Sequence, residues 1–170
     1  MKYTRAETTI ILNICIPFLN SLGIQTINRE ISTACFLPGL LIENGNIIID
    51  MGKLLYPGDI LHEAGHIAVV PAFERVLLNN ESVIASKNRE AEEMMAIAWS
   101  YAACMHLDLD PLIVFHENGY RGAGESIVEN FHAGRFFGVP SLHWCNMTTD
   151  PGNAKRGDVV YPQMKKWLRD

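Results

Sequence analysis

Two histidines and a glutamate, in the order His62-Glu63-x-x-His66, are the residues in this sequence best suited to chemistry. On an α-helix, residues four apart lie on one face, so both imidazoles can reach the same ion. Imidazole nitrogens bind Zn²⁺ at about 2.0–2.1 Å. Glu63 lies one step round the helix, where its carboxylate can take a proton from water bound to the metal. The spacing therefore predicts a zinc site with Glu63 as general base.

A helix must carry this motif, and the flanking residues predict where it lies. Asp59 is expected to cap the helix, and Pro71 requires it to weaken shortly before that position. Upstream, an Asn-Gly pair between apolar runs predicts a β-hairpin over residues 40–50. Downstream, a long helical pattern covers residues 89–106, and a strip of small residues on it could pack against the motif helix. These elements place the motif between a hairpin and a long helix.

The rest of the chain predicts further helices. Residues 10–19 are apolar, and we interpret them as part of an early core helix that ends at Gly23, and not as a signal peptide. A later helix is expected over residues 125–136, with Gly138 as part of its stop signal, and residues 159–168 form an element that fits strand or helix equally. The expected fold is α+β, a mostly helical single domain (1–170) with a small β-sheet.

Composition excludes several classes of function. The chain has 170 residues, of which 48% are hydrophobic and 19% charged, and its net charge is -5. This acidic balance gives no basic face for nucleic acid and no polybasic patch for a membrane. The apolar run near the N-terminus is shorter than the roughly 20 residues of a membrane-spanning helix. Four cysteines form no Cys-x-x-Cys pair, so we expect free thiols in the cytoplasm.

The motif resembles the signature of the zincin metallopeptidases, which is His-Glu-x-x-His on a helix. The metzincin branch has glycine and histidine three and six residues after the second motif histidine, whereas this chain has Val69 and Ala72. The chain is more similar to the gluzincins, in which a glutamate on a later helix completes the site. It also loosely resembles small cytoplasmic peptidases of the ImmA/IrrE type. The resemblance covers the motif helix and one later helix, and it implies a minimal zincin-like core.

The resemblance implies a third metal ligand, and Glu92 and Glu93 fit that role at the start of the second long helix. Periodicity alone leaves both open. We favour Glu93, because Glu92 continues the polar surface of residues 89–90. His106, His116 and a more distant carboxylate remain alternatives.

Two further polar residues lie in or beside a glycine-rich loop at residues 119–124. His116 and Tyr120 are candidates to stabilise the oxyanion, a role that tyrosine, histidine or arginine fills in zincins. The hairpin could offer its strand edge to an extended peptide or protein substrate. Together these features imply a zinc-dependent, peptidase-like hydrolase. The alternative is a non-catalytic, metal-binding regulatory or protein-interaction module.

Overall fold

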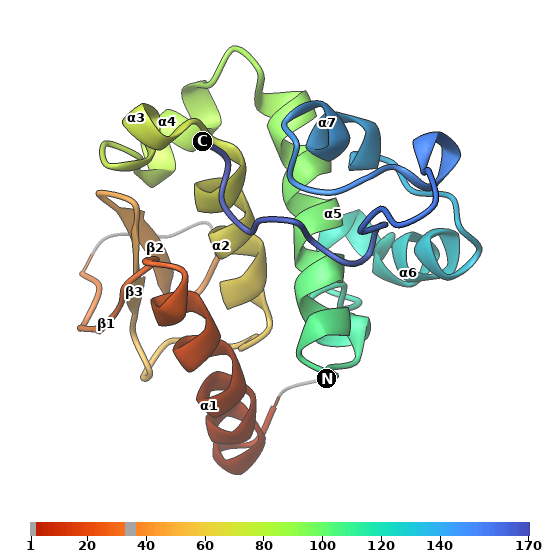
Figure 1. Ribbon diagram of the computed structural model, residues 1–170. Coiled ribbons are helices and arrows are strands. Elements are labelled where there is room, and N and C mark those ends of the chain that lie inside the picture. Colours follow the sequence, from red (N-terminus) through yellow and green to blue (C-terminus); the bar gives the residue numbers. More distant parts are fainter. Residues whose placement is uncertain (1–2, 33–36) are drawn as a thin grey trace.

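Two helices, α2 (Asp59–Val69) and α5 (Arg89–His106), lie side by side at the centre of the fold, as Figure 1 shows for the computed structural model. The structure describes residues 3–32 and 37–170. Every residue of α2 is buried, and α5 is buried over most of its length. The predicted α+β fold, mostly helical with a small sheet, is confirmed.

Small residues allow α2 and α5 to approach closely. A Cβ atom added at Gly65 would lie 2.9 Å from the carbonyl oxygen of Ala96. One turn further along α5, the Ser100 hydroxyl donates hydrogen bonds to the carbonyls of Ala96, at 2.6 Å, and of Leu61, at 3.2 Å. The predicted strip of small residues therefore faces the motif helix.

This close approach makes Gly65 a sensitive position. The Gly65→Leu variant is expected to lose roughly 1–3 kcal/mol of unfolding free energy, because the added side chain overpacks the contact with α5. Urea unfolding of both proteins measures the difference. Gly52→Ala is the control, because a Cβ there meets only the Asp50 carboxylate, at 3.3 Å. Equal losses in the two variants would contradict the packing argument.

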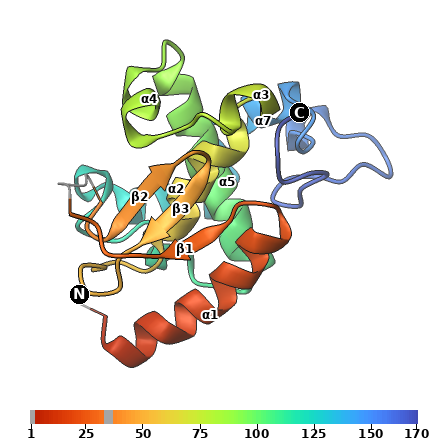
Figure 2. The ribbon, with the colours of Figure 1, turned by 90° about the vertical axis from the view of Figure 1, so that its left-hand side faces the viewer.

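A three-stranded sheet packs against α2, with strand order β1-β3-β2 (Figure 2). Strands β2 (Leu40–Glu43) and β3 (Asn46–Ile49) form the predicted antiparallel hairpin. Its turn residues, Asn44 and Gly45, both have positive φ, as the Asn-Gly pair predicts. Strand β1 (Thr26–Asn28) pairs in parallel with β3 on the other side. The central strand supplies three buried isoleucines to the core.

Helix α1 (Arg5–Ser21) contacts β1 and α2, and it is the early core helix that the apolar run predicts. It begins with a capping box, in which Thr4 and Glu7 satisfy each other's backbone N–H groups. It ends at Ser21, Leu22 is the cap residue, and Gly23 follows with φ of +88°. Among the described residues no helix combines the length and apolar character needed to cross a membrane.

The remaining elements are short and surround the α2–α5 pair. They are α3 (Ala72–Arg75), α4 (Asn80–Ala85), α6 (Gly124–His132) and α7 (Val139–Trp144), with 3₁₀ turns η1 (Pro111–Ile113), η2 (Tyr120–Gly122) and η3 (Pro151–Asn153).

Two predictions in the second half are wrong in detail. Helix α6 stops at His132 instead of residue 136, and Gly134 follows with positive φ. Gly138 does not stop that helix but is the N-cap residue of the next one, α7. Residues 159–168 form neither strand nor helix, apart from one bridge between Val160 and Thr149.

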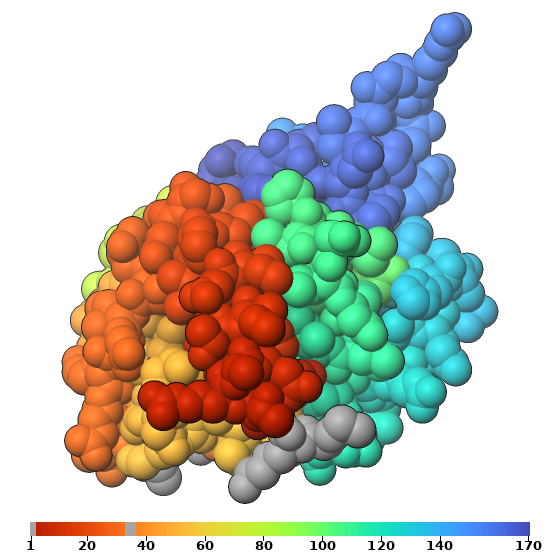
Figure 3. All heavy atoms as spheres, turned by 90° about the horizontal axis from the view of Figure 1, so that it is seen from below, coloured from red at the N-terminus to blue at the C-terminus, as the bar shows by residue number. Residues whose placement is uncertain are grey.

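The C-terminal segment packs back onto the two central helices. The Trp99 indole on α5 donates a hydrogen bond to the carbonyl of Trp167 at 2.8 Å, and the Arg169 N–H bonds to the carbonyl of Ala68 on α2 at 2.9 Å. Before this segment, residues 151–159 are exposed throughout, and the blue part of the chain projects from the body in Figure 3.

The thiols of Cys15, Cys104 and Cys145 are free. Cys35 lies outside the described residues.

Candidate metal centre

Three predicted ligands meet between α2 and α5. The Nε2 atoms of His62 and His66 lie 3.1 Å apart, and the two carboxylate oxygens of Glu93 lie 3.5 Å and 3.4 Å from them, respectively. In a tetrahedron around Zn²⁺, donors at 2.0–2.1 Å from the ion are separated by about 3.3 Å. The three observed separations therefore have the size that one Zn²⁺ requires. The side chains form a potential metal-binding triad.

The packing of the two helices sets this geometry. His62 and His66 are one turn apart on α2, and Glu93 projects from the first turns of α5. The close contact at Gly65 brings the helices near enough for the carboxylate to reach both rings. The histidine side chains are only 11% and 10% exposed, whereas Glu93 is 41% exposed. Glu93 is thus the most exposed of the three side chains.

Burial keeps the two imidazoles neutral, which is the form that binds metal. It lowers the pKa of His66 to about 4, with a smaller contribution from the positive charge of Arg89. Burial also lowers the pKa of His62 well below its ordinary value, and the neighbouring His66 acts in the same direction. At neutral pH each ring therefore carries a free nitrogen lone pair.

Glu63 lies beside the triad and is almost completely buried, at 9% exposed. Burial, with smaller contributions from the carboxylates of Asp59 and Glu93, raises its pKa to about 8. A carboxyl group in this position exchanges a proton readily near neutral pH. A divalent cation at the triad would act in the opposite direction and favour the ionised form. Glu63 thus has the surroundings of a general base.

Tyr120 and His116 lie on the segment between η1 and α6, and Tyr120 is the first residue of η2. The ring of Tyr120 stands edge-on to that of His62, with centroids 5.5 Å apart. Its hydroxyl is buried and has no hydrogen-bond partner among the described residues. Burial, with nearby carboxylates, raises the pKa of Tyr120 well above its ordinary value, so the phenol keeps its proton. Tyr120 is therefore a hydrogen-bond donor without an acceptor.

His116, by contrast, already has a partner. Its Nε2 lies 3.1 Å from a carboxylate oxygen of Asp59, and its ring stacks on Tyr56 with centroids 3.8 Å apart. The expectation that Asp59 caps α2 is wrong: Gly58 is the cap residue, and Asp59 is the first helical residue. Its side chain turns to His116 instead of the backbone, because it is buried against that ring.

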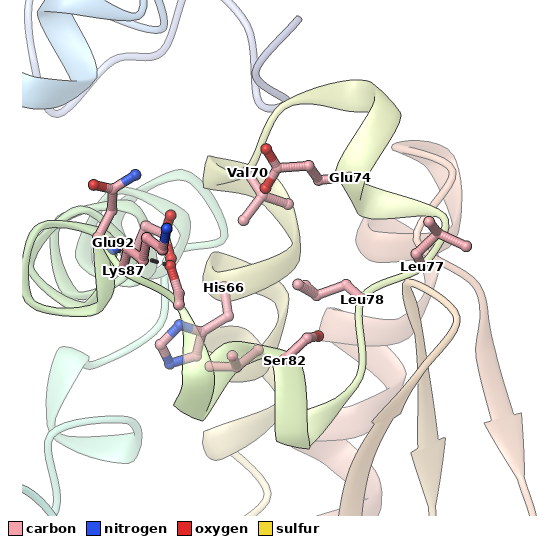
Figure 4. Close-up of a pocket in the computed structure, with 11 residues that line it drawn as sticks. His66, Val70, Glu74, Leu77, Leu78, Ser82, Lys87 and Glu92 are labelled. Carbon is pink, nitrogen blue, oxygen red and sulfur yellow. Dashed lines mark hydrogen bonds between the residues drawn. The ribbon is translucent and has the colours of Figure 1, made fainter.

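The other candidate ligands lie elsewhere. The ring of His106 packs against Phe18 and Trp167, at centroid distances of 5.4 Å and 5.2 Å. Glu92 does not join the triad. It lines a pocket of about 390 Å³ that lies between the C-terminal half of α2, the α3–α4 region and the start of α5 (Figure 4).

This pocket adjoins the triad, because His66 forms part of both. One part of its wall is apolar and comes from Val70, Leu77, Leu78 and Val83. The rest is polar and comes from Glu74, Ser82, Ser86, Lys87, Asn88 and Glu92. Figure 4 shows Leu78 and Ser82 on the same side of the pocket as α4, facing His66. A ligand in this pocket would lie next to the imidazole ring of His66.

The outer edge of β2 is not free for an incoming strand. Its two outward N–H donors are both occupied: Leu40 donates to the carbonyl of Leu37 at 3.2 Å, and Ile42 donates to the side-chain oxygen of Asn80 at 2.7 Å. Asn80 belongs to α4, which therefore covers this edge. An extended peptide could pair with β2 only after α4 moves.

Sequence reasoning missed Asp59 as a residue of the site. A signal was present, because Asp59 precedes Glu63 by four residues and so lies on the same face of the helix. The pocket was not predicted from the sequence either, because most of its lining residues lie in residues 70–92 and come together only in the folded protein.

Comparison of the chain with protein-family models, with curated proteins and with solved structures finds no match.

Proposed function

We propose that this protein is a zinc-dependent hydrolase with peptidase-like activity, related to the gluzincin branch of the zincins. One observation carries the proposal: the donor atoms of His62, His66 and Glu93 are separated by 3.1–3.5 Å, as expected for a tetrahedral Zn²⁺ site. Three protein ligands leave a fourth position open, which is typical of catalytic zinc and not of structural zinc. Zinc supplies Lewis acidity, which polarises a carbonyl and makes water a stronger acid.

The side chains around the triad have the properties that amide hydrolysis needs. In this proposal Glu63 takes a proton from the attacking water and returns it to the leaving amine. The Tyr120 hydroxyl is a protonated, unpartnered donor next to His62, so it suits the oxygen on which negative charge develops. The pocket beside His66 offers room for a side chain of a peptide substrate. Free thiols at Cys15 and Cys104 fit the proposed cytoplasmic location.

One observation favours a second candidate function. Because Asn80 and the carbonyl of Leu37 occupy the donors of β2, the strand edge next to the pocket is closed to an extended substrate. A metal-binding regulatory module, which needs no turnover, is compatible with a closed edge.

Metal analysis followed by an activity screen separates the two functions. We expect about one zinc per chain in protein purified without added metal, and turnover of some members of a peptide library that chelation abolishes and Zn²⁺ restores. A protein that binds zinc but cleaves no library member would favour the regulatory module. A protein that does not bind zinc would contradict both.

A further inference from the structure

The loop that carries Tyr120 is in close backbone contact with the first turn of α2. A Cβ atom at Gly58 would lie 2.1 Å from the carbonyl oxygen of Ile113, so the two segments touch at the helix start. At the other end of the loop, a Cβ at Gly124 would lie 2.1 Å from the carbonyl oxygen of Phe115. These glycines allow residues 111–124 to fold tightly against the helix that holds the metal ligands.

One buried side-chain pair joins this loop to the helix. The hydrogen bond between His116 and Asp59 is 3.1 Å long, and the two side chains are only 10% and 6% exposed. Tyr56 covers the imidazole face to face, with an angle of 10° between the ring planes. The pair therefore has a fixed position, and it lies one helical turn before Glu63.

His116 is not suited to stabilise an oxyanion itself. Its Nδ1 atom is buried without a partner among the described residues. Its Nε2 atom is engaged with the Asp59 carboxylate at 3.1 Å, and Tyr56 covers the face of the ring. The donor role then falls to Tyr120, and His116 must act through its position.

Tyr120 needs such support, because its backbone conformation is unfavourable. Tyr120 and Arg121 both lie in the left-handed region, at φ of +52° and +55°. Each such residue costs about 1–3 kcal/mol and persists only where the surrounding structure holds it. The Tyr120 ring packs against the ring of Phe115, with centroids 5.2 Å apart, and against the ring of His62. The turn that leads into it begins at His116, whose carbonyl accepts the Gly119 N–H at 3.0 Å.

We infer that Asp59 and His116 are positioning residues that hold the Tyr120 hydroxyl beside the metal centre. This inference rests on the proposed function for its catalytic meaning, but the anchoring of the loop is a property of the fold. Breaking the pair releases the start of the turn, and the strained backbone at Tyr120 then relaxes away from His62. Metal binding is unaffected, since neither residue belongs to the triad.

Hydrogen exchange tests the anchoring without any activity assay. In the zinc-loaded protein, His116→Ala and Asp59→Ala should each raise exchange of the backbone amides of residues 117–123 by roughly 10-fold or more, and leave those of residues 95–104 unchanged. Asp59→Asn keeps an acceptor for His116 and should restore slow exchange. Unchanged loop exchange in both alanine variants overturns the inference, whatever the activity of the protein.

A double-mutant cycle tests the catalytic consequence. His116→Ala should lower kcat by roughly 10- to 100-fold with unchanged zinc affinity. In the Tyr120→Phe background the same change should lower kcat by no more than about twofold, because the hydroxyl it positions is gone. Equal effects in both backgrounds overturn the inference. If the wild-type protein shows no turnover, the proposed function fails while the exchange experiment still decides the anchoring.

Discussion

Replacing Glu63 by glutamine is expected to abolish hydrolysis and leave zinc bound. Glutamine has nearly the same shape, so the buried site beside His62 should keep its packing, but the amide cannot take up a proton. General acid–base catalysis contributes about 10²–10⁴-fold to rate, and kcat/KM should fall by this factor. Steady-state kinetics on a peptide found in the library screen measures the fall, and elemental analysis of the same sample measures the metal.

Glu92→Gln is the matched control for this experiment. It makes the same chemical change one residue from Glu93 on α5, on the pocket wall and outside the triad. We expect kcat at saturating substrate within about twofold of the wild-type value, because Glu92 neither holds the metal nor transfers the proton. The comparison uses kcat and not KM, because Glu92 lines the pocket proposed for the substrate. If Glu63→Gln retained full activity with zinc bound, Glu63 would not be the general base.

The second large effect is expected on metal binding. The Glu93→Ala variant loses the only carboxylate of the triad, and its zinc affinity should fall by more than the roughly 10- to 100-fold that changes outside the ligand sphere cause. Competition with a chromogenic chelator measures the affinity. Thermal unfolding gives a second reading, because zinc at 100 times its Kd stabilises the native state by about 2.7 kcal/mol, and this gain should disappear in the variant.

Glu92→Ala again provides the comparison, since it removes an adjacent carboxylate from the same helix. Its zinc affinity should match that of the wild type. The opposite result, with Glu92→Ala the weaker binder, would assign the third ligand to Glu92 and require α5 to turn relative to α2. Loss of affinity in neither variant would place the third ligand outside α5.

The sequence predicts the motif helix well because its signals are local. The four-residue spacing of His62 and His66 and the helix-ending effect of Pro71 each depend only on residues close in the sequence. The hairpin turn at residues 44–45 and the helix over residues 89–106 also follow from short-range patterns, and both are confirmed. The choice between Glu92 and Glu93 is different in kind. It depends on how α5 is rotated against α2, which the contact at Gly65 fixes only in the folded protein.

Features that depend on contacts between residues far apart in the sequence were not predicted. Asp59 has the sequence properties of a helix cap, but the ring of His116, 57 residues away, competes for its carboxylate. Residues 159–168 have an apolar pattern that fits strand or helix. They adopt neither because their backbone groups bond to distant parts of the chain: the N–H groups of Tyr161 and Lys165 donate to the carbonyls of Thr149 and Met147, and the carbonyl of Trp167 accepts from an indole on α5. In each case a tertiary contact outweighs a local preference.

The side-chain contacts at the outer strands of the sheet also bear on how the protein behaves at high concentration. An asparagine side chain bonds to the backbone of each outer strand. The side-chain oxygen of Asn20 accepts a hydrogen bond from the Thr26 N–H of β1 at 2.9 Å, and that of Asn80 accepts one from the Ile42 N–H of β2. Unprotected strands recruit copies of themselves into fibres, and a strand as rich in isoleucine as β3 would be prone to do so if its neighbours were lost. Two asparagine amides thus help to keep a small, strongly apolar sheet from growing by addition of further chains.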